Sequence, residues 1–379
     1  MKLNWKPLAA AATLVVSAAP ALADINVGVI FSLTGPAASL GKETRKAIDL
    51  MPNALGGEKI NYIVLDDATD PSQAVKNARK LVLEDKVDVL FGVNAIPSAL
   101  SIAPVAVESK TAFLAQAPVV VGPDLHRYTF RIEPLAEVMV GRVVSDMKER
   151  GIKNVGFIGF TDAWGELLLK ALTKTTESEG IKITSIERYG RTDPSVMGQV
   201  MKTISAKPDA VFVGGSGTPA ALPHITLRER GYAGPIYHSH AVANKDFLRV
   251  GGKAIEGARL AIAPVLVAEQ LPDSQPNKAA GLALDKALTA KFGPDSRSSF
   301  AGASWDGWLV LEGALKAALA TAKPGTPEFR EAVRNGLEKT SKVVGANGTY
   351  TMSAEDHGGY DPKSAVLVDV VDGKWKLTK

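Results

Sequence analysis

Cysteine is absent from the 379-residue sequence. Its absence excludes disulfide bridges, thiolate zinc sites, cysteine nucleophiles and the lipid-modified cysteine of a bacterial lipoprotein. An excess of one charge is also missing, because 44 lysines and arginines stand against 40 aspartates and glutamates and leave a formal charge of +4. So small a margin argues against a dedicated nucleic-acid binder, which normally shows a basic stripe. The sequence also lacks low-complexity tracts and internal repeats of about 20–50 residues.

The overall composition is that of a globular protein. Hydrophobic residues make up 46% of the chain and charged residues 22%, which excludes a disordered or fibrous protein. At roughly 100–200 residues per domain, the length predicts two domains or three.

Residues 1–23 have the pattern of a secretory signal peptide. Two lysines precede the apolar stretch from Leu8 to Ala19, and Ala21-Leu22-Ala23 forms a small-x-small cleavage site before Asp24. The alternative is an N-terminal membrane anchor, but the apolar stretch is shorter than the ~20 residues that span a bilayer. No later stretch reaches that length without charge. We therefore expect a soluble, exported protein without membrane insertion or a lipid anchor, located in the periplasm.

Short β-branched runs alternate with helix-like segments along the remaining chain. This alternation indicates βαβ units and parallel sheets, and hence an α/β fold. The runs form two series, which predict two similar lobes: Ile25–Phe31, Ile60–Leu65, Val87–Phe91 and Ala112–Leu114, then Asn154–Phe160, Lys182–Tyr189, Ala210–Val213 and Pro235–His238.

The C-terminal part is too short to fold alone, so we expect it to return to both lobes. It contains a long predicted helix, Ser299–Ala322, and a strand-like run, Ala365–Val371. We predict that residues 24–134 and about 270–349 form the first lobe, and that residues 135–269 and about 350–379 form the second. Several crossings between the lobes would make a hinge.

Gly215, Gly217 and Ala220 match the dinucleotide-binding pattern G-x-G-x-x-A, but the match is weak. It lies mid-chain, and no acidic residue ends a following strand about 20 residues later. We interpret these glycines instead as a place where the carboxylate of a ligand meets the N-terminus of the helix that begins near Pro219. A simple turn without a ligand is the alternative. A nucleophilic role for Ser216 would require G-x-S-x-G, and Thr218 replaces the last glycine.

Metal binding has little support in the sequence. His238 and His240 would share a face if both lay on a strand, but no third ligand is evident. The acidic cluster Asp66–Asp70 lacks the glycine and terminal glutamate of a calcium loop. We interpret this cluster as turn and helix-cap chemistry, with Asp70 as N-cap and Pro71 at the first helical position. We expect no metal and no cofactor.

Loops that follow predicted strands are the best places for a ligand, because open parallel sheets bind ligands outside the carboxyl ends of their strands. Three such loops are Gly92–Ser98, Leu114–Ala117 and Thr161–Glu166. Facing lobes would line a cleft with these loops. Trp164 would then be either a packing residue or an aromatic wall of the cleft.

Several motifs, in order along the whole mature chain, resemble those of one family. They are Phe31-Ser32-Leu33-Thr34-Gly35-Pro36 with Gly41, Leu65-Asp66-Asp67, Asp162-Ala163-Trp164-Gly165, Val213-Gly214-Gly215 and Trp305-Asp306-Gly307. The set resembles the type I periplasmic solute-binding proteins of branched-chain amino-acid (Leu/Ile/Val-binding) ABC transporters. The resemblance implies two Rossmann-like lobes joined by a three-crossover hinge. It also implies a non-enzymatic, monomeric protein that traps a small solute and delivers it to a membrane permease.

The resemblance also suggests site residues. In that family the first lobe holds the ligand carboxylate with backbone N–H groups and a hydroxyl, and the matching loops here are Asn94–Ser98 and Ala115–Pro118. The second lobe usually supplies an aromatic residue at the position of Trp164. The ligand-binding residues that we predict are Leu40, Asn94, Ser98, Gln116, Ala117, Trp164, Ser216, Gly217 and His240.

Two departures from the family pattern bear on the ligand. His240 stands where the family usually has the glutamate that pairs with the ligand ammonium, and a buried ammonium without an acid partner is costly by several kcal/mol. The family often has tyrosines at the positions of Ser216 and Gly217, so these two smaller residues would widen the pocket. We therefore expect a small carboxylate, favouring a benzoate or cinnamate derivative with His240 or Ser216 bonded to a ring hydroxyl. A branched-chain or other hydrophobic amino acid, or a sensing role for the same fold, are the alternatives.

Overall fold

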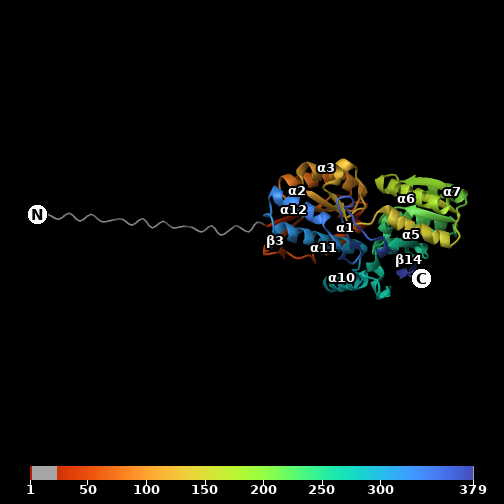
Figure 1. Cartoon of the computed structure of the whole chain (residues 1–379). Helices are drawn as coiled ribbons and strands as arrows, with labels where there is room; N and C mark the ends of the chain where they lie inside the picture. Colours follow the sequence, from red (N-terminus) through yellow and green to blue (C-terminus); the bar gives the residue numbers. More distant parts are fainter. Residues whose placement is uncertain (2–23, 379) are drawn as a thin grey trace.

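The computed structural model describes Met1 and residues 24–378, so the predicted signal peptide lies outside the described residues apart from Met1. Within this part, the chain forms two α/β lobes that lie side by side (Figure 1). This arrangement confirms the predicted fold class.

Lobe 1 is built on a six-stranded sheet in the described chain, with the order β2-β3-β1-β4-β5-β6. Its strands are parallel except for the short antiparallel pair β2–β3. The strands are β1 (Ile25–Phe31), β2 (Ala54–Leu55), β3 (Glu58–Asp66), β4 (Val89–Gly92), β5 (Ala112–Ala115) and β6 (Thr129–Arg131). The intervening helices are α1 (Ala38–Ile48), α2 (Pro71–Leu83), α3 (Ile96–Ser109) and α4 (Pro123–His126).

Lobe 2 is built on a seven-stranded sheet with the order β15-β14-β11-β10-β9-β7-β8. Five strands are parallel, and β14 and β15 join antiparallel at one edge. The strands are β7 (Asn154–Phe160), β8 (Lys182–Tyr189), β9 (Ala210–Gly214), β10 (Ile236–His238), β11 (Arg259–Ile262), β14 (Val366–Val371) and β15 (Lys374–Leu377). Its helices are α5 (Ala136–Glu149), α6 (Ala163–Glu179), α7 (Met197–Ser205), α8 (Ala221–Glu229) and α9 (Lys245–Gly251).

The segment between β11 and β14 returns to lobe 1, where α11 packs against α1 and α12 (Figure 1). It holds α10 (Asn277–Phe292), α11 (Ser299–Leu319), α12 (Pro327–Glu338) and the two-stranded pair β12 (Val343–Val344) and β13 (Thr349–Tyr350). The chain therefore crosses between the lobes after β6, after β11 and after β13. The lobe limits, 24–134 with about 270–349 and 135–269 with about 350–379, stay a prediction.

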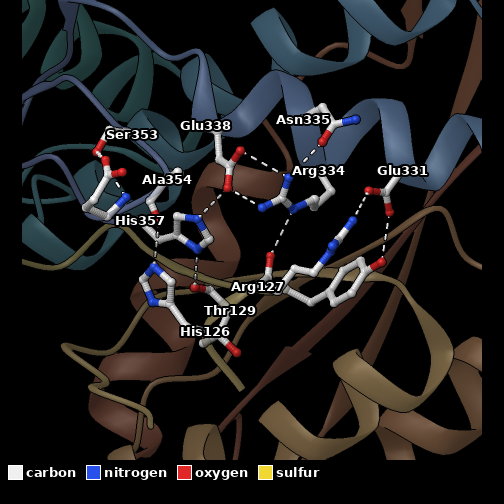
Figure 2. A network of polar contacts seen from close by, with 12 residues as sticks. His126, Arg127, Thr129, Glu331, Arg334, Asn335, Glu338, Ser353, Ala354 and His357 are labelled. Atoms are coloured by element: carbon white, nitrogen blue, oxygen red, sulfur yellow. Dashed lines mark hydrogen bonds and ion pairs between the residues drawn. The ribbon is translucent and has the colours of Figure 1, made fainter. Parts of the chain in front are cut away.

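The third crossover is fastened to β6 through His357. Its Nδ1 lies 3.1 Å from the carbonyl oxygen of Thr129, and its Nε2 lies 3.0 Å from Oε1 of Glu338, as Figure 2 shows. The His357 ring is stacked against both Phe130 and His126, with 4.0 Å between centroids in each pair. These contacts fix the end of β6, from which the chain enters the first crossover.

Local sequence accounts for the helix starts that matter at the site. Asp70 accepts a hydrogen bond from the backbone N–H of Gln73 and has Pro71 after it, so its predicted capping role is confirmed. Asp162 caps α6 by accepting from the N–H groups of Trp164 and Gly165. These caps place the first turn of each helix beside the carboxyl end of the preceding strand.

Candidate functional site

A small cavity of about 20 Å³ lies between the lobes, well below the roughly 300–1,000 Å³ typical of small-molecule sites. Lobe 1 contributes Leu40, Asn94, Gln116 and Phe300, and lobe 2 contributes Trp164, Arg191, Ser216 and His240. The first crossover adds Glu133. The structure thus brings together Leu40, Asn94, Gln116, Trp164, Ser216 and His240 from the predicted set.

Arg191 supplies a fixed positive charge to the cavity wall. Its Nε donates to Oδ2 of Asp162 at 2.5 Å, and its Nη1 donates to Oγ of Ser216 at 2.8 Å. The guanidinium carbon also lies 4.4 Å from the ring centroid of Phe160. A guanidinium held in this way presents a planar set of donors, which suits a carboxylate.

Arg191 was not predicted as a site residue. It follows β8 at the carboxyl end of the strand, which is the same positional signal that selected the loop containing Trp164. Its partners Asp162 and Ser216 are 29 and 25 residues away in sequence, so no local motif reveals the cluster.

Trp164 combines both roles considered for it, packing residue and cavity wall. The side chain is buried, and its Nε1 donates to the carbonyl oxygen of Gly215 at 3.2 Å. Its ring meets the His240 ring edge-on, with 5.6 Å between centroids. With Leu40 and Phe300, it gives the cavity apolar surface.

The lobe 1 wall offers polar groups from two loops. Oδ1 of Asn94 accepts from the N–H of Ser32 at 3.3 Å. Oε1 of Gln116 accepts from Oγ of Ser304 at 2.6 Å, while Nε2 of Gln116 is buried and has no partner among the described residues. A buried donor of this kind favours an acceptor atom on a bound molecule.

Glu133 and His240 meet across the lobes. Oε2 of Glu133 lies 3.8 Å from Nε2 of His240. Burial raises the pKa of Glu133 to about 8, with a further contribution from the negative charge of Asp306. Burial also lowers the pKa of His240 to about 4. Both side chains are therefore mainly uncharged at pH 7, and the structure adds an acid to a cavity for which the sequence suggested none.

Three predicted residues lie outside the cavity lining. Ser98 and Ala117 are buried and do not line it. Gly217 has φ +59°, and a Cβ there would lie 2.9 Å from Oγ of Ser39 and 3.0 Å from Cδ1 of Leu40. This glycine therefore allows the two lobes to approach closely.

The alternative chemistries find little support in the geometry. Ser216 is bonded to a guanidinium, which cannot act as a base for a serine nucleophile. The turn after Gly217 is a 3-10 helix, η1 (Thr218–Ala220), and the N–H of Gly217 donates to the carbonyl of Ala241. The carboxylate expected at this turn is therefore better matched by Arg191.

Metal binding by His238 and His240 also lacks geometric support. β10 ends at His238, so strand alternation does not extend to His240. Nε2 of His238 instead lies 2.8 Å from Nδ1 of His224. In residues 24–378 no group of three or more histidines, cysteines and acids is placed to hold a metal ion.

Asp66 supports the interpretation of the acidic cluster as turn chemistry. It accepts hydrogen bonds from the N–H groups of Leu33, Thr34 and Ala68.

None of the helices within residues 24–378 is both long and apolar enough to cross a membrane.

Comparisons with known proteins agree with this architecture. The family model described as periplasmic binding protein matches residues 24–374. Leu/Ile/Val-binding protein homolog 3 of Brucella melitensis biotype 1 is 27% identical over 350 residues, covering 89% of each chain.

Solved structures extend the similarity. An extracellular ligand-binding receptor from Rhodopseudomonas palustris HaA2 is 42% identical with a TM-score of 0.91, covering 94% of this chain and 100% of the receptor. A solute binding protein of an ABC transporter from Rhodopseudomonas palustris BisB5, in complex with 3,4-dihydroxy benzoic acid, is 22% identical with a TM-score of 0.77. That match covers 93% of this chain and 95% of the other, and at this identity it shows a shared fold.

Proposed function

The chain belongs to the periplasmic binding protein family, in its branched-chain amino-acid group, and from that premise we propose that it captures a small carboxylate for an ABC uptake transporter. The favoured ligand is an aromatic acid such as a benzoate or cinnamate derivative. The single observation that carries this proposal is the guanidinium of Arg191, which Asp162 and Ser216 hold at the cavity wall.

Arg191 favours a carboxylate because charge-assisted hydrogen bonds are about twice as strong as neutral ones. The cavity places this cation beside the buried Trp164 and near apolar surface from Leu40 and Phe300. An aromatic ring fits such a wall, since offset or edge-on ring contacts add about 0.5–1.5 kcal/mol beyond area burial.

The amino-acid alternative remains open because Glu133 lines the cavity. An ammonium ligand would require the ionised carboxylate of Glu133, and burial opposes ionisation by raising its pKa to about 8. An aromatic acid requires no such ionisation. The balance therefore favours an acid without an α-amino group.

The proposed mechanism is closure of the lobes over the ligand. The open form binds solute on lobe 1, and contacts with Arg191, Trp164 and Ser216 of lobe 2 form only on closure. A ligand that makes contacts only in the closed state shifts the population toward that state. A membrane permease would then recognise the closed surface and accept the unaltered ligand, with the protein acting as a monomer in the periplasm and needing no cofactor.

A thermal-shift and calorimetry panel tests the ligand class. Benzoate, 4-hydroxybenzoate, cinnamate and 4-hydroxycinnamate are compared with leucine, isoleucine and valine. Ligand at 100 times its Kd should add about 2.7 kcal/mol of stability, and we expect this from aromatic acids. Stabilisation by the aliphatic amino acids alone would defeat the aromatic-acid proposal.

Two further observations separate the remaining roles. Recovery of the bound acid unchanged after long incubation with purified protein supports binding without turnover, and accumulation of a product contradicts it. If the gene for this protein lies beside permease and ATPase genes, its position supports transport. If it lies beside a kinase gene, its position favours the sensing alternative.

A further inference from the structure

Glu133 is a buried acid whose hydrogen-bonding capacity is unused. It is 8% exposed, and no described residue forms a hydrogen bond to its carboxyl group. Nε2 of His240 lies 3.8 Å from Oε2 of Glu133, which is too far for a hydrogen bond. Nδ1 of His240 is also buried without a partner among the described residues. Since unpaired buried polar groups are destabilising, this pair is suited to a polar group from a bound molecule.

The position of the pair separates it from the cation. A second small cavity, of about 10 Å³, adjoins the first and shares Glu133, His240 and Phe300 as its wall. Arg191 and Ser216 do not line this second cavity. A ligand whose carboxylate lies on Arg191 therefore has a different part of the cavity wall, bearing Glu133 and His240, available for a second polar group.

The charges around Glu133 favour its neutral form. The groups that face it are His240 from the loop after β10, Asp306 of α11, Tyr350 of β13 and Tyr360 of the third crossover. The carboxylate of Asp306 already has hydrogen-bond partners, since it accepts hydrogen bonds from the N–H groups of residues 346–348 and from the hydroxyl of Tyr350. None of these groups is a permanent cation. A neutral carboxylic acid can donate through its O–H and accept through its C=O, as a hydroxyl partner requires.

We propose that Glu133 and His240 form a hydroxyl-binding subsite, which makes the protein selective for aromatic acids that carry a ring hydroxyl over the same acids without one. This inference rests on the proposed function, because the Arg191 end must hold the carboxylate. Glu133 donates to the ligand hydroxyl oxygen, and the hydroxyl hydrogen is donated to the unprotonated nitrogen of His240. An unsubstituted ring leaves both groups unpaired, and a site built for a hydroxyl rejects such an analogue strongly.

The test is a ratio of affinities measured by calorimetry at pH 7. The two probe pairs are 4-hydroxybenzoate with benzoate, and 4-hydroxycinnamate with cinnamate. For the wild type we expect the hydroxylated member of at least one pair to bind 10-fold or more tightly. Glu133→Gln keeps a neutral donor and an acceptor and should retain most of that ratio. Glu133→Leu removes both and should bring the ratio to within about 3-fold of unity.

Ser216→Ala is the matched control, because Ser216 is hydrogen-bonded to Arg191 and does not line the second cavity. It should weaken both members of a pair to a similar degree and leave their ratio unchanged. A ratio that is near unity in the wild type, or that persists in Glu133→Leu, overturns the hydroxyl subsite while leaving carboxylate binding intact. Far-ultraviolet circular dichroism and thermal unfolding establish that each variant is folded, and His240→Leu gives an independent second variant with the same expected loss.

A different result would identify the failure of the proposed function itself. If no aromatic acid binds and leucine does, with binding abolished in Glu133→Gln, then Glu133 is the partner of an ammonium group. Binding of leucine would then release a proton from Glu133 at pH 7, which calorimetry in buffers of different ionisation enthalpy detects. Both the aromatic ligand and the hydroxyl subsite are overturned by that outcome.

Discussion

Nε of Arg191 donates to Oδ2 of Asp162 at 2.5 Å, while the other carboxylate oxygen of Asp162 accepts from the N–H groups that begin α6. One aspartate thus orients the guanidinium and caps the helix that carries Trp164. Because Arg191 is only 14% exposed, its orientation is set by protein contacts more than by water. The arrangement links the cation and the aromatic wall of the cavity in one rigid unit.

Replacing Arg191 by Gln should weaken binding of an aromatic acid by about 10- to 100-fold, since hydrogen bonds to charged groups are worth about 1.5–3 kcal/mol. Arg188→Gln is the matched control. Arg188 lies on β8, the strand that Arg191 follows; it pairs with Glu166 and does not line the cavity, so the affinity should be unchanged. Calorimetry with benzoate and 4-hydroxybenzoate measures both variants. Equal losses in the two variants would remove Arg191 from the site.

The Asp162→Asn variant separates the two roles of Asp162, which are orienting the guanidinium of Arg191 and capping helix α6. Asparagine is a good N-cap, so the stability of α6 should be nearly retained, while the charge that holds Arg191 is lost. We expect a smaller loss of affinity than in Arg191→Gln, of about 3- to 10-fold. Asp162→Ala should also lose about 1 kcal/mol of stability with the cap. Wild-type affinity in Asp162→Asn would contradict the orienting role.

Gly217→Ala should hinder closure of the lobes. The added Cβ would meet Ser39 and Leu40 of the opposite lobe within about 3 Å, as the 2.9 and 3.0 Å contacts indicate. Gly231→Ala is a matched control, because Gly231 also has positive φ, +81°, but has nothing within 4 Å of an added Cβ. Only Gly217→Ala should lose affinity. Because Gly217 has φ +59° and ψ −157°, a conformation that is essentially restricted to glycine, thermal unfolding is needed to establish that this variant is folded.

Small-angle scattering checks the cause of that loss. Addition of 4-hydroxybenzoate should compact Gly231→Ala as it compacts the wild type, and should compact Gly217→Ala less. Identical affinity and compaction in the two glycine variants would show that Gly217 has no part in closure.

The sequence predicts the regular elements of the fold well where local patterning is strong. The ends of β1, β7 and β8 agree with the predicted runs, and α11 begins at the predicted Ser299. The short strands β6 and β11 were not predicted, because each has only three or four residues and includes an arginine. Arg259 of β11 is compatible with burial because Asp146 and Asp369, more than 100 residues away, neutralise it.

Residues that line the cavity were predictable where the position of one loop after a strand is enough to select them, as with Trp164 and Ser216; their role in ligand binding stays a prediction. Arg191 and Glu133 were missed for a physical reason. Their significance depends on which residues the tertiary fold places beside them, namely Asp162 and Ser216 for Arg191, and His240 for Glu133. Single-sequence spacing contains no such long-range contact.

The His224–His238 pair should make the protein sensitive to acid. Burial lowers the pKa of His224 to about 2 and that of His238 to about 3, so the folded protein keeps both rings neutral. In the unfolded chain they take up protons below about pH 6.5. Stability from this pair is therefore present above pH 6.5 and is lost as the pH falls.

Replacement of both histidines by Leu removes this proton uptake. As the pH falls from 7 to 5, the free energy of unfolding of the double variant should rise by about 2–4 kcal/mol relative to that of the wild type. Urea unfolding at a series of pH values measures the difference, in which the contributions of other groups cancel. A difference that does not change with pH would show that the two rings do not titrate on unfolding.

Glu133→Gln should have the opposite pH dependence. The folded protein holds the pKa of Glu133 at about 8, above its usual value of 4.5, because the carboxyl group is buried near Asp306. The folded state therefore binds the proton more tightly, and stability from this group is present below pH 4.5 and is lost as the pH rises toward 8.

Glutamine resembles the protonated acid at every pH. The variant and the wild type should have similar stability near pH 4, and the variant should be more stable at pH 7 by up to about 3 kcal/mol. Urea unfolding of the ligand-free proteins at both pH values measures this gain. A gain that is equal at pH 4 and pH 7 would mean that Glu133 ionises as readily in the folded protein as in the unfolded chain, and the hydroxyl subsite would then lose its neutral donor.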